Sequence, residues 1–111
     1  NGDIRDLSDA KEKITESGCD GAMIGRGMFG NPWVFAGRAQ EDTPLRDKLS
    51  ALLRLAQDFE QLRPQKNFAI LKKHVKAFVT GFNGAAELRE RIMGAETAEE
   101  MGRVIRESSL Y

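Results

Sequence analysis

The sequence predicts two structural classes in succession, an α/β segment over residues 1–44 and an all-α segment over residues 45–111. In the first segment, an amphipathic stretch is followed by a short apolar run between glycines, which favours a helix and then a buried strand. In the second segment, apolar residues recur at helical spacing as far as the end of the chain. The polar stretch 40–44 ends in Pro44 and separates the two compositions, so we place a domain boundary there.

The α/β segment contains the elements of half a βαβ unit. A helix is predicted over about 8–16, with Ser8 as its N-cap and Gly18 as the glycine that ends it. The run 21–25 (Gly-Ala-Met-Ile-Gly) is too short for a helix and predicts a buried strand of a parallel sheet. Pro32 suits the first position of the helix that follows. Loop, helix and strand in this order are typical of a sheet covered by helices.

The all-α segment predicts four helices. Apolar stripes indicate helices over about 45–62, 66–80 and 85–93. The run Thr97-Ala98-Glu99-Glu100 has the form of a capping box, which predicts the start of a fourth helix. Because the connections are short, we expect a small four-helix bundle.

Composition excludes several classes of function. The apolar fraction of 41% is enough for a core, but no apolar run approaches the length of a membrane span. With one cysteine and one histidine we expect no metal site and no internal disulfide, which fits a cytoplasmic location. The chain begins at Asn1 inside a predicted loop, so we expect it to be a fragment of a longer protein.

Charge is divided unevenly along the chain. Residues 1–44 hold five Lys and Arg against eight Asp and Glu, whereas residues 45–111 hold twelve against nine. The basic excess is concentrated between Arg63 and Arg91, with seven basic residues against two acidic ones. Such a patch attracts polyanions, although an ordinary solvated face has the same composition.

Two glycine-containing loops have the composition of a phosphate site. One is Asn1-Gly2-Asp3, and the other, Gly25-Arg26-Gly27, follows the predicted strand. Glycines allow backbone N–H groups to approach phosphate oxygens, a helix N-terminus adds a favourable dipole, and an arginine adds a charge-assisted bond. Glycines after a strand are also ordinary turn formers, so the spacing alone leaves both interpretations open.

Longer motifs favour one family. The strings NGDI (1–4), GCDGAMIGRG (18–27) and GNPWVF (30–35) closely resemble the tRNA-dihydrouridine synthase family. A weaker likeness continues through Lys72-Lys73-His74 and the run 84–89. The resemblance therefore covers nearly the whole chain, most strongly up to about residue 38.

This resemblance implies a fold and an activity. Residues 1–44 would be the C-terminal end of an FMN-binding (β/α)8 TIM barrel, and residues 45–111 a helical tRNA-binding domain. Members of the family reduce particular uridines of tRNA to dihydrouridine, with FMN that NADPH has reduced. The full-length protein is expected to be a monomer.

The resemblance also implies site residues. The family's contacts to the FMN phosphate correspond to Asn1, Gly2, Asp3, Gly25 and Arg26. The residues that we expect to bind tRNA are Lys72, Lys73, Lys76, Arg89 and Arg91, of which the three lysines share one face of their predicted helix.

The family's catalytic cysteine lies earlier in the barrel, outside these residues. Cys19, between the predicted helix and strand, is expected to be a small packed residue. We therefore expect this chain to hold no catalytic residue and to be inactive alone. We also expect residues 45–111 to fold independently, whereas residues 1–44 would need the rest of the barrel.

Two alternatives remain at this stage. One keeps the flavin barrel but gives it a small-molecule substrate, for which the basic helical segment has no obvious use. The other is a helical module that binds RNA or protein without catalysis. In that case the three family motifs in residues 1–38, which occur in register, would be a chance resemblance.

Overall fold

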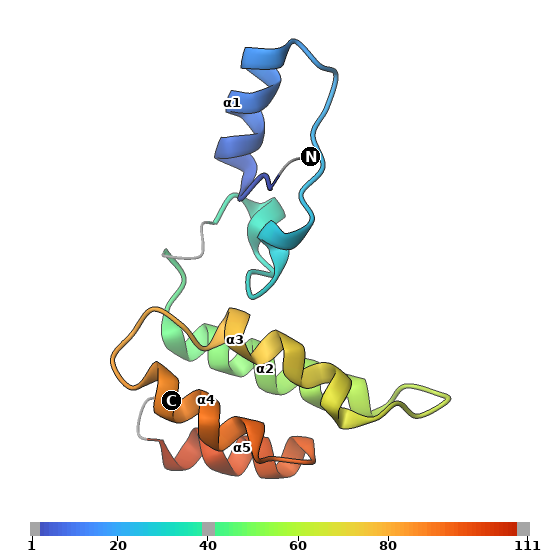
Figure 1. Cartoon of the computed structure of the whole chain (residues 1–111), viewed down its shortest axis with the longest axis vertical. Coiled ribbons are helices and arrows are strands. Elements are labelled where there is room, and N and C mark those ends of the chain that lie inside the picture. The colour runs from blue at the N-terminus through green and yellow to red at the C-terminus, as the bar shows by residue number, and fades with distance from the viewer. Residues whose placement is uncertain (1–2, 39–41, 109–111) are drawn as a thin grey trace. The chain divides into compact units, whose positions relative to one another are not determined.

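A computed structural model of the chain describes residues 3–38 and 42–108 (Figure 1). The chain divides into two compact units, Asn1–Thr43 and Pro44–Tyr111. The described residues of the first include helix α1 (Leu7–Ser17) and the 3-10 turns η1 (Arg26–Met28) and η2 (Val34–Ala36). The second contains α2 (Leu45–Glu60), the 3-10 helix η4 (Phe68–His74), α3 (Val75–Phe78), α4 (Ala85–Met93) and α5 (Ala98–Glu107).

The N-cap of helix α1 is Asp6, two residues earlier than the predicted cap, Ser8. The backbone of Asp6 is extended, and its carboxylate accepts a hydrogen bond from the Asp9 N–H at 2.8 Å. Ser8 therefore lies inside the first turn and is not the N-cap, because Asp6 already satisfies the amide that a cap must reach. The predicted end is confirmed: Gly18 has φ +72° and donates its N–H to the Ile14 carbonyl.

The predicted strand over residues 21–25 is not formed. Within residues 3–38 and 42–108 no segment is a β-strand, and Met23 is 60% exposed. A parallel strand exists only through hydrogen bonds to neighbouring strands, and none of the described residues of this unit provides one. The apolar run has the composition of a buried strand without the partners that would bury it.

The helix expected to start at Pro32 is shortened to the 3-10 turn η2. It begins after Trp33, and the following Gly37 has φ +82°, which ends it after one turn. Val34 is fully buried, whereas Phe35 is 65% exposed. Only the first of these two side chains is therefore buried.

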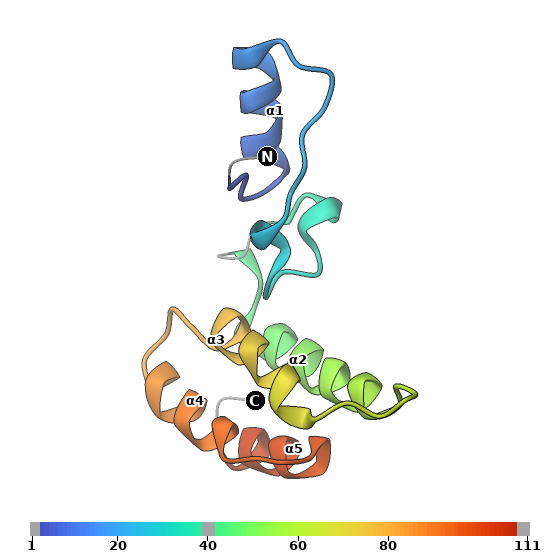
Figure 2. The ribbon, with the colours of Figure 1, turned by 45° about the vertical axis from the view of Figure 1, so that its right-hand side comes forward.

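The helical segments of the second unit surround one apolar core. Figures 1 and 2 show α2 beside η4 and α3, and α4 beside α5. Every segment contributes to the core; its fully buried large side chains are Leu49, Leu52, Leu71, Val75, Val79, Ile92, Met101 and Ile105. The apolar periodicity of the sequence therefore identified most of the buried faces, but Leu62, at the end of the first predicted helix, is 47% exposed.

The element predicted over 66–80 differs in kind from its expected form. It is a seven-residue 3-10 helix, η4, followed by the single turn α3, rather than one α-helix. Asn67 caps it by accepting from the Ala69 N–H at 2.9 Å, and the Ile70 N–H donates to the Asn67 carbonyl. These bonds begin the segment with the tighter i to i+3 spacing.

Helix α5 starts at the predicted cap. The Thr97 hydroxyl accepts from the Glu100 N–H at 3.1 Å, while the Glu100 carboxylate accepts from the Glu96 N–H at 2.8 Å, one residue before the position that a capping box requires. The Ala98 N–H donates to the carboxylate of Glu60 at 3.0 Å. The start of α5 is thereby attached to the end of α2.

We predict that Leu52→Ala lowers the free energy of unfolding of the helical unit by about 2–5 kcal/mol, because the change leaves a cavity in a fully buried position. Leu62, just beyond α2, is 47% exposed and provides the matched control. Leu62→Ala should change stability by less than about 0.5 kcal/mol. Chemical denaturation followed by circular dichroism measures both, and equal losses would contradict the assignment of the core.

Candidate functional site

The two glycine-containing loops of the first unit meet through an ion pair. The Arg26 guanidinium donates through Nη2 to the Oδ1 of Asp3, although the two residues are 23 positions apart. Both side chains are largely exposed, 77% for Arg26 and 66% for Asp3. Asn1 and Gly2, the other predicted members of the first loop, lie outside the described residues.

Gly27 determines how closely the loops approach. A Cβ at this position would lie 2.5 Å from the Ile4 carbonyl oxygen and 2.6 Å from that of Arg5. Both obstacles are backbone atoms and cannot move aside as a flexible side chain would. Ile4 is buried, so its side chain anchors the first loop while its carbonyl group contacts the second. Only glycine at position 27 allows this contact.

The two loops provide open space and an arginine for an anion, but they do not provide a helix dipole. Around Gly25 the space is open, since an added Cβ would meet only the terminal methyl carbon of Met23, at 3.9 Å. Beside it, the exposed Arg26 guanidinium has donors beyond the one that Asp3 occupies. The helix dipole expected from the sequence is not supplied by η1, which has only three residues. An oxyanion here would depend on the arginine and on close backbone approach.

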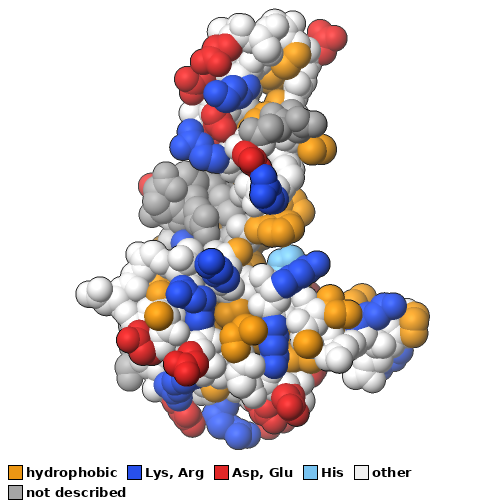
Figure 3. All heavy atoms as spheres, viewed as in Figure 1, with side chains coloured by type: hydrophobic (Ala, Val, Ile, Leu, Met, Phe, Trp, Pro, Cys, Tyr) orange, Lys and Arg blue, Asp and Glu red, His pale blue; other side chains and the backbone are white. Residues whose placement is uncertain are grey.

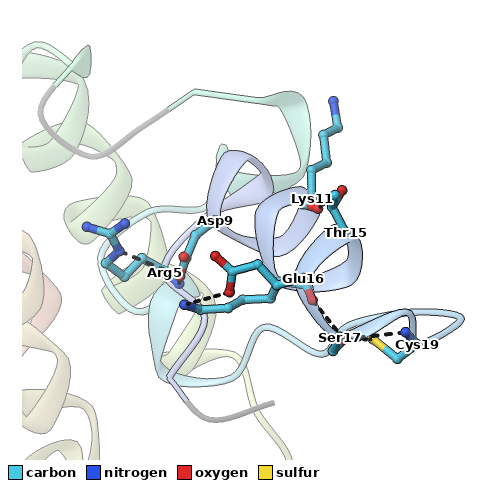
Figure 4. A network of polar contacts seen from close by, with 8 residues as sticks. Arg5, Asp9, Lys11, Thr15, Glu16, Ser17 and Cys19 are labelled. Carbon is cyan, nitrogen blue, oxygen red and sulfur yellow. Dashed lines mark hydrogen bonds and ion pairs between the residues drawn. The ribbon is translucent and has the colours of Figure 1, made fainter.

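Polar contacts fix both ends of α1 (Figure 4). At its start, Asp9 accepts from the Arg5 N–H at 3.0 Å and lies 3.6 Å from the Arg5 guanidinium. The backbone hydrogen bond, reinforced by the charge of Arg5, lowers the pKa of the Asp9 carboxyl. The contact holds Arg5 in place next to Gly27, so the helix start supports the meeting of the loops.

Cys19 is exposed, which corrects the expectation that it packs in the interior. No described element covers the chain after α1, so nothing buries the thiol. The Ser17 hydroxyl donates to Sγ at 3.0 Å, and this bond lowers the pKa of the Cys19 thiol (Figure 4). Sγ in turn donates to the Gly21 carbonyl at 3.2 Å.

Two predicted RNA-binding residues make hydrogen bonds within the helical unit. The Lys72 ammonium donates to the Met93 carbonyl at 2.8 Å, at the end of α4. The Arg89 guanidinium donates to the Val79 carbonyl at 2.8 Å, at the end of α3. Each cation thus satisfies a terminal carbonyl of the neighbouring helix and complements its dipole.

The other three differ in their availability. Arg91 lies 3.3 Å from the Glu107 carboxylate, a bond between α4 and α5. The Lys73 and Lys76 side chains are exposed, and neither ammonium group forms an ion pair or hydrogen bond within the part of the chain that the structure describes. His74 lies between them in sequence; burial lowers its pKa and the charge of Lys73 lowers it further, which favours the neutral imidazole at neutral pH.

One face of the helical unit combines basic and apolar groups. Figure 3 shows Lys and Arg side chains distributed over the visible face, with Asp and Glu side chains toward its lower edge. The face is basic without being uniformly so.

A groove of about 700 Å³ lies at one end of the helical unit, and sequence reasoning missed it. Its walls come from the end of α2, the loop that precedes η4, and the connection from α4 to α5. The residues that line it include Phe59, Gln65, Lys66, Asn67, Lys72 and Glu96. No local motif predicts such a groove, because the groove forms only when three separate segments pack together.

Comparison with known proteins resolves the family. The model of the dihydrouridine synthase family matches residues 1–110. The chain belongs to the dihydrouridine synthase family.

Relatives agree with this assignment. The chain is 33% identical to a probable tRNA-dihydrouridine synthase of Mycobacterium leprae (strain TN), over 91% of this chain and 29% of the relative. It is 37% identical to a probable tRNA-dihydrouridine synthase of Staphylococcus aureus (strain Mu50), over 90% of this chain and 31% of the relative. It is 36% identical to probable tRNA-dihydrouridine synthase 2 of Bacillus subtilis (strain 168), over 91% and 31% respectively.

The chain therefore spans a little under a third of the length of these dihydrouridine synthases. No solved structure matches it. Among residues 3–38 and 42–108, no group of His, Cys, Asp and Glu side chains is arranged to hold a metal ion. No helix in these ranges is both long and apolar enough to cross a membrane.

The contacts of this dihydrouridine synthase chain predict that Lys72 and Arg89 stabilise the helical unit. Lys72→Met and Arg89→Met keep apolar length but leave a helix-terminal carbonyl unpaired, so each should lower the free energy of unfolding by about 0.5–1.5 kcal/mol. Lys73→Met and Lys76→Met are the matched controls, with expected changes within about 0.5 kcal/mol. Urea denaturation of the four variants provides the measurement. If all four were equally stable, the two hydrogen bonds would have no structural value.

Proposed function

We propose that this chain is part of an FMN-dependent tRNA-dihydrouridine synthase, which reduces specific uridines of tRNA to 5,6-dihydrouridine at the expense of NAD(P)H. The observation that supports it best is the meeting of Asp3 and Arg26 across two loops in a member of this family. These loops contain the motifs most specific to the family. In our proposal, the cofactor phosphate binds where these two loops meet.

In this proposal, residues 1–44 are the C-terminal end of the FMN-binding (β/α)8 barrel. Arg26 and Gly25 face the phosphate from one loop, and Asn1, Gly2 and Asp3 belong to the other. Bound FMN supplies the reducing equivalents for the uridine double bond. The chain's own contribution is to hold the phosphate end of the cofactor, since an arginine binds oxyanions through charge-assisted hydrogen bonds.

The catalytic cysteine lies outside this chain in our proposal, so the chain alone is inactive. Cys19 does not take that role, because it follows the C-terminal end of α1 beside Ser17, whereas Asp6 and the loops that meet lie at the N-terminal end. We place the complete enzyme in the cytoplasm as a monomer, without a membrane anchor and without a metal.

Residues 45–111 form the tRNA-binding domain in our proposal. Lys73 and Lys76 supply the phosphate contacts, because they are exposed and their charge is not engaged within residues 42–108. Lys72, Arg89 and Arg91 hold neighbouring helices together and add to the positive field of the same face. Contacts of this kind contribute affinity without reading sequence.

The proposed reaction can be tested with the full-length protein, NADPH and an unmodified tRNA transcript. We expect the purified protein to be yellow with bound flavin and one or more uridines to gain two hydrogens, as measured by mass spectrometry of the nucleosides. A yellow, folded protein that modifies none of a panel of tRNAs would contradict the tRNA substrate. That result would favour a flavin enzyme for a small molecule.

If Lys73 and Lys76 contact RNA phosphates, replacing them should reduce the salt dependence of tRNA binding. Lys73→Ala combined with Lys76→Ala should lower the slope of log affinity against log salt by about 1–2, because two phosphate contacts are lost. Arg54→Ala with Arg103→Ala removes the same charge from residues that already pair with acids on their own helices, and serves as the control. Filter binding of unmodified tRNA over a range of salt concentrations measures the slope. An equal effect of the control pair would show that only net charge matters.

A further inference from the structure

The Asp3 carboxylate can accept a hydrogen bond from Arg26, but it cannot donate one to a phosphate. An ionised carboxylate only accepts hydrogen bonds, and so does a phosphate. Asp3 therefore offers no donor to a phosphate through its side chain, and its charge repels one. The side chain does offer an acceptor to Arg26, and that is the contact it makes.

Arg26 needs such a partner because its side chain has little else to hold it. It is 77% exposed, and its loop neighbours Gly25 and Gly27 have no side chains to pack against it. A long exposed side chain loses conformational entropy when it is fixed in one position. Asp3 engages one terminal nitrogen, Nη2, and leaves the remaining donors of the guanidinium to face another anion.

The backbone of Asp3 supports the same interpretation. Its φ of +63° lies in the left-handed region, where aspartate and asparagine are the side chains best tolerated after glycine. In this backbone conformation the Asp3 carboxylate lies beside the Arg26 guanidinium. The first loop is held against the second by the backbone contact at Gly27, so the geometry of the pair does not depend on a flexible link.

We propose that Asp3 is a positioning residue, whose carboxylate orients the Arg26 guanidinium for the FMN phosphate and does not itself bind the phosphate. This inference rests on the proposed flavin function. Because the pair has no net charge, it favours an anion through the orientation of the guanidinium donors and not through a net attraction. An oriented guanidinium can donate two parallel hydrogen bonds to the anion. Removing the carboxylate adds net positive charge, but at an exposed site water and salt screen that gain.

The experiment compares FMN with riboflavin, which has the same ring system and no phosphate. Dissociation constants come from quenching of flavin fluorescence by the apo form of the full-length protein. Asp3→Asn keeps the size and the left-handed backbone preference and removes the charge. Arg26→Lys keeps the charge and removes the planar fork. Glu12→Gln, on the exposed face of α1, removes one carboxylate elsewhere and is the matched control.

We expect Asp3→Asn to weaken FMN binding by about fivefold, the value of roughly 1 kcal/mol for an ion pair, and to leave riboflavin binding unchanged. Arg26→Lys should reduce the preference for FMN at least as much, and a double variant should add little to the single ones. Glu12→Gln should bind both flavins as the parent does. A merely structural role of Asp3 would instead weaken both flavins together.

The outcomes separate this inference from the function on which it rests. If the parent prefers FMN to riboflavin and Arg26→Lys loses that preference while Asp3→Asn keeps or strengthens it, the positioning role is wrong and the flavin site stands. If the parent binds neither flavin, the proposed cofactor is wrong and the inference falls with it.

Discussion

The absence of a side chain at residue 27 is the constraint on which the first unit depends. Two carbonyl oxygens, those of Ile4 and Arg5, occupy the volume that a Cβ would need. This close approach joins the loop before α1 to the loop after residue 25, and it places Asp3 within reach of Arg26. The capping of α1 by Asp6 and the bond between Arg5 and Asp9 then fix the first loop from its other side. The candidate phosphate site is the result of these backbone restraints more than of any side chain.

In the helical unit, part of the positive charge is used to hold the fold together. Lys72 and Arg89 each donate to a carbonyl at the end of a neighbouring helix, and Arg91 pairs with Glu107. A basic residue that stabilises its own domain still contributes to the electric field outside it, because the hydrogen bond does not neutralise its charge. The Lys73 and Lys76 side chains are exposed, whereas the charge of Arg91 is balanced locally by the Glu107 carboxylate.

Sequence reasoning succeeded where the deciding interactions are local. The glycine at 18, the Thr97 cap and the helix over 85–93 depend on neighbours within a few residues, and they are found where they were expected. It was wrong at the start of α1, where Asp6 rather than Ser8 is the N-cap. It could not foresee the groove near Phe59 or the bond from Arg89 to Val79, because each depends on how distant segments pack.

The run 21–25 shows a different limit. Its composition is that of a buried strand, but no described segment pairs with it. A helix satisfies its hydrogen bonds within itself, whereas a strand satisfies them only through others. The helices of the second unit satisfy their backbone hydrogen bonds within themselves and share a buried core, whereas Met23 and Phe35 in the first unit are exposed. In the barrel that we propose, neighbouring strands would complete this run. The open space at Gly25, at the end of the same run, would then lie at the edge of a sheet, where barrels bind phosphate.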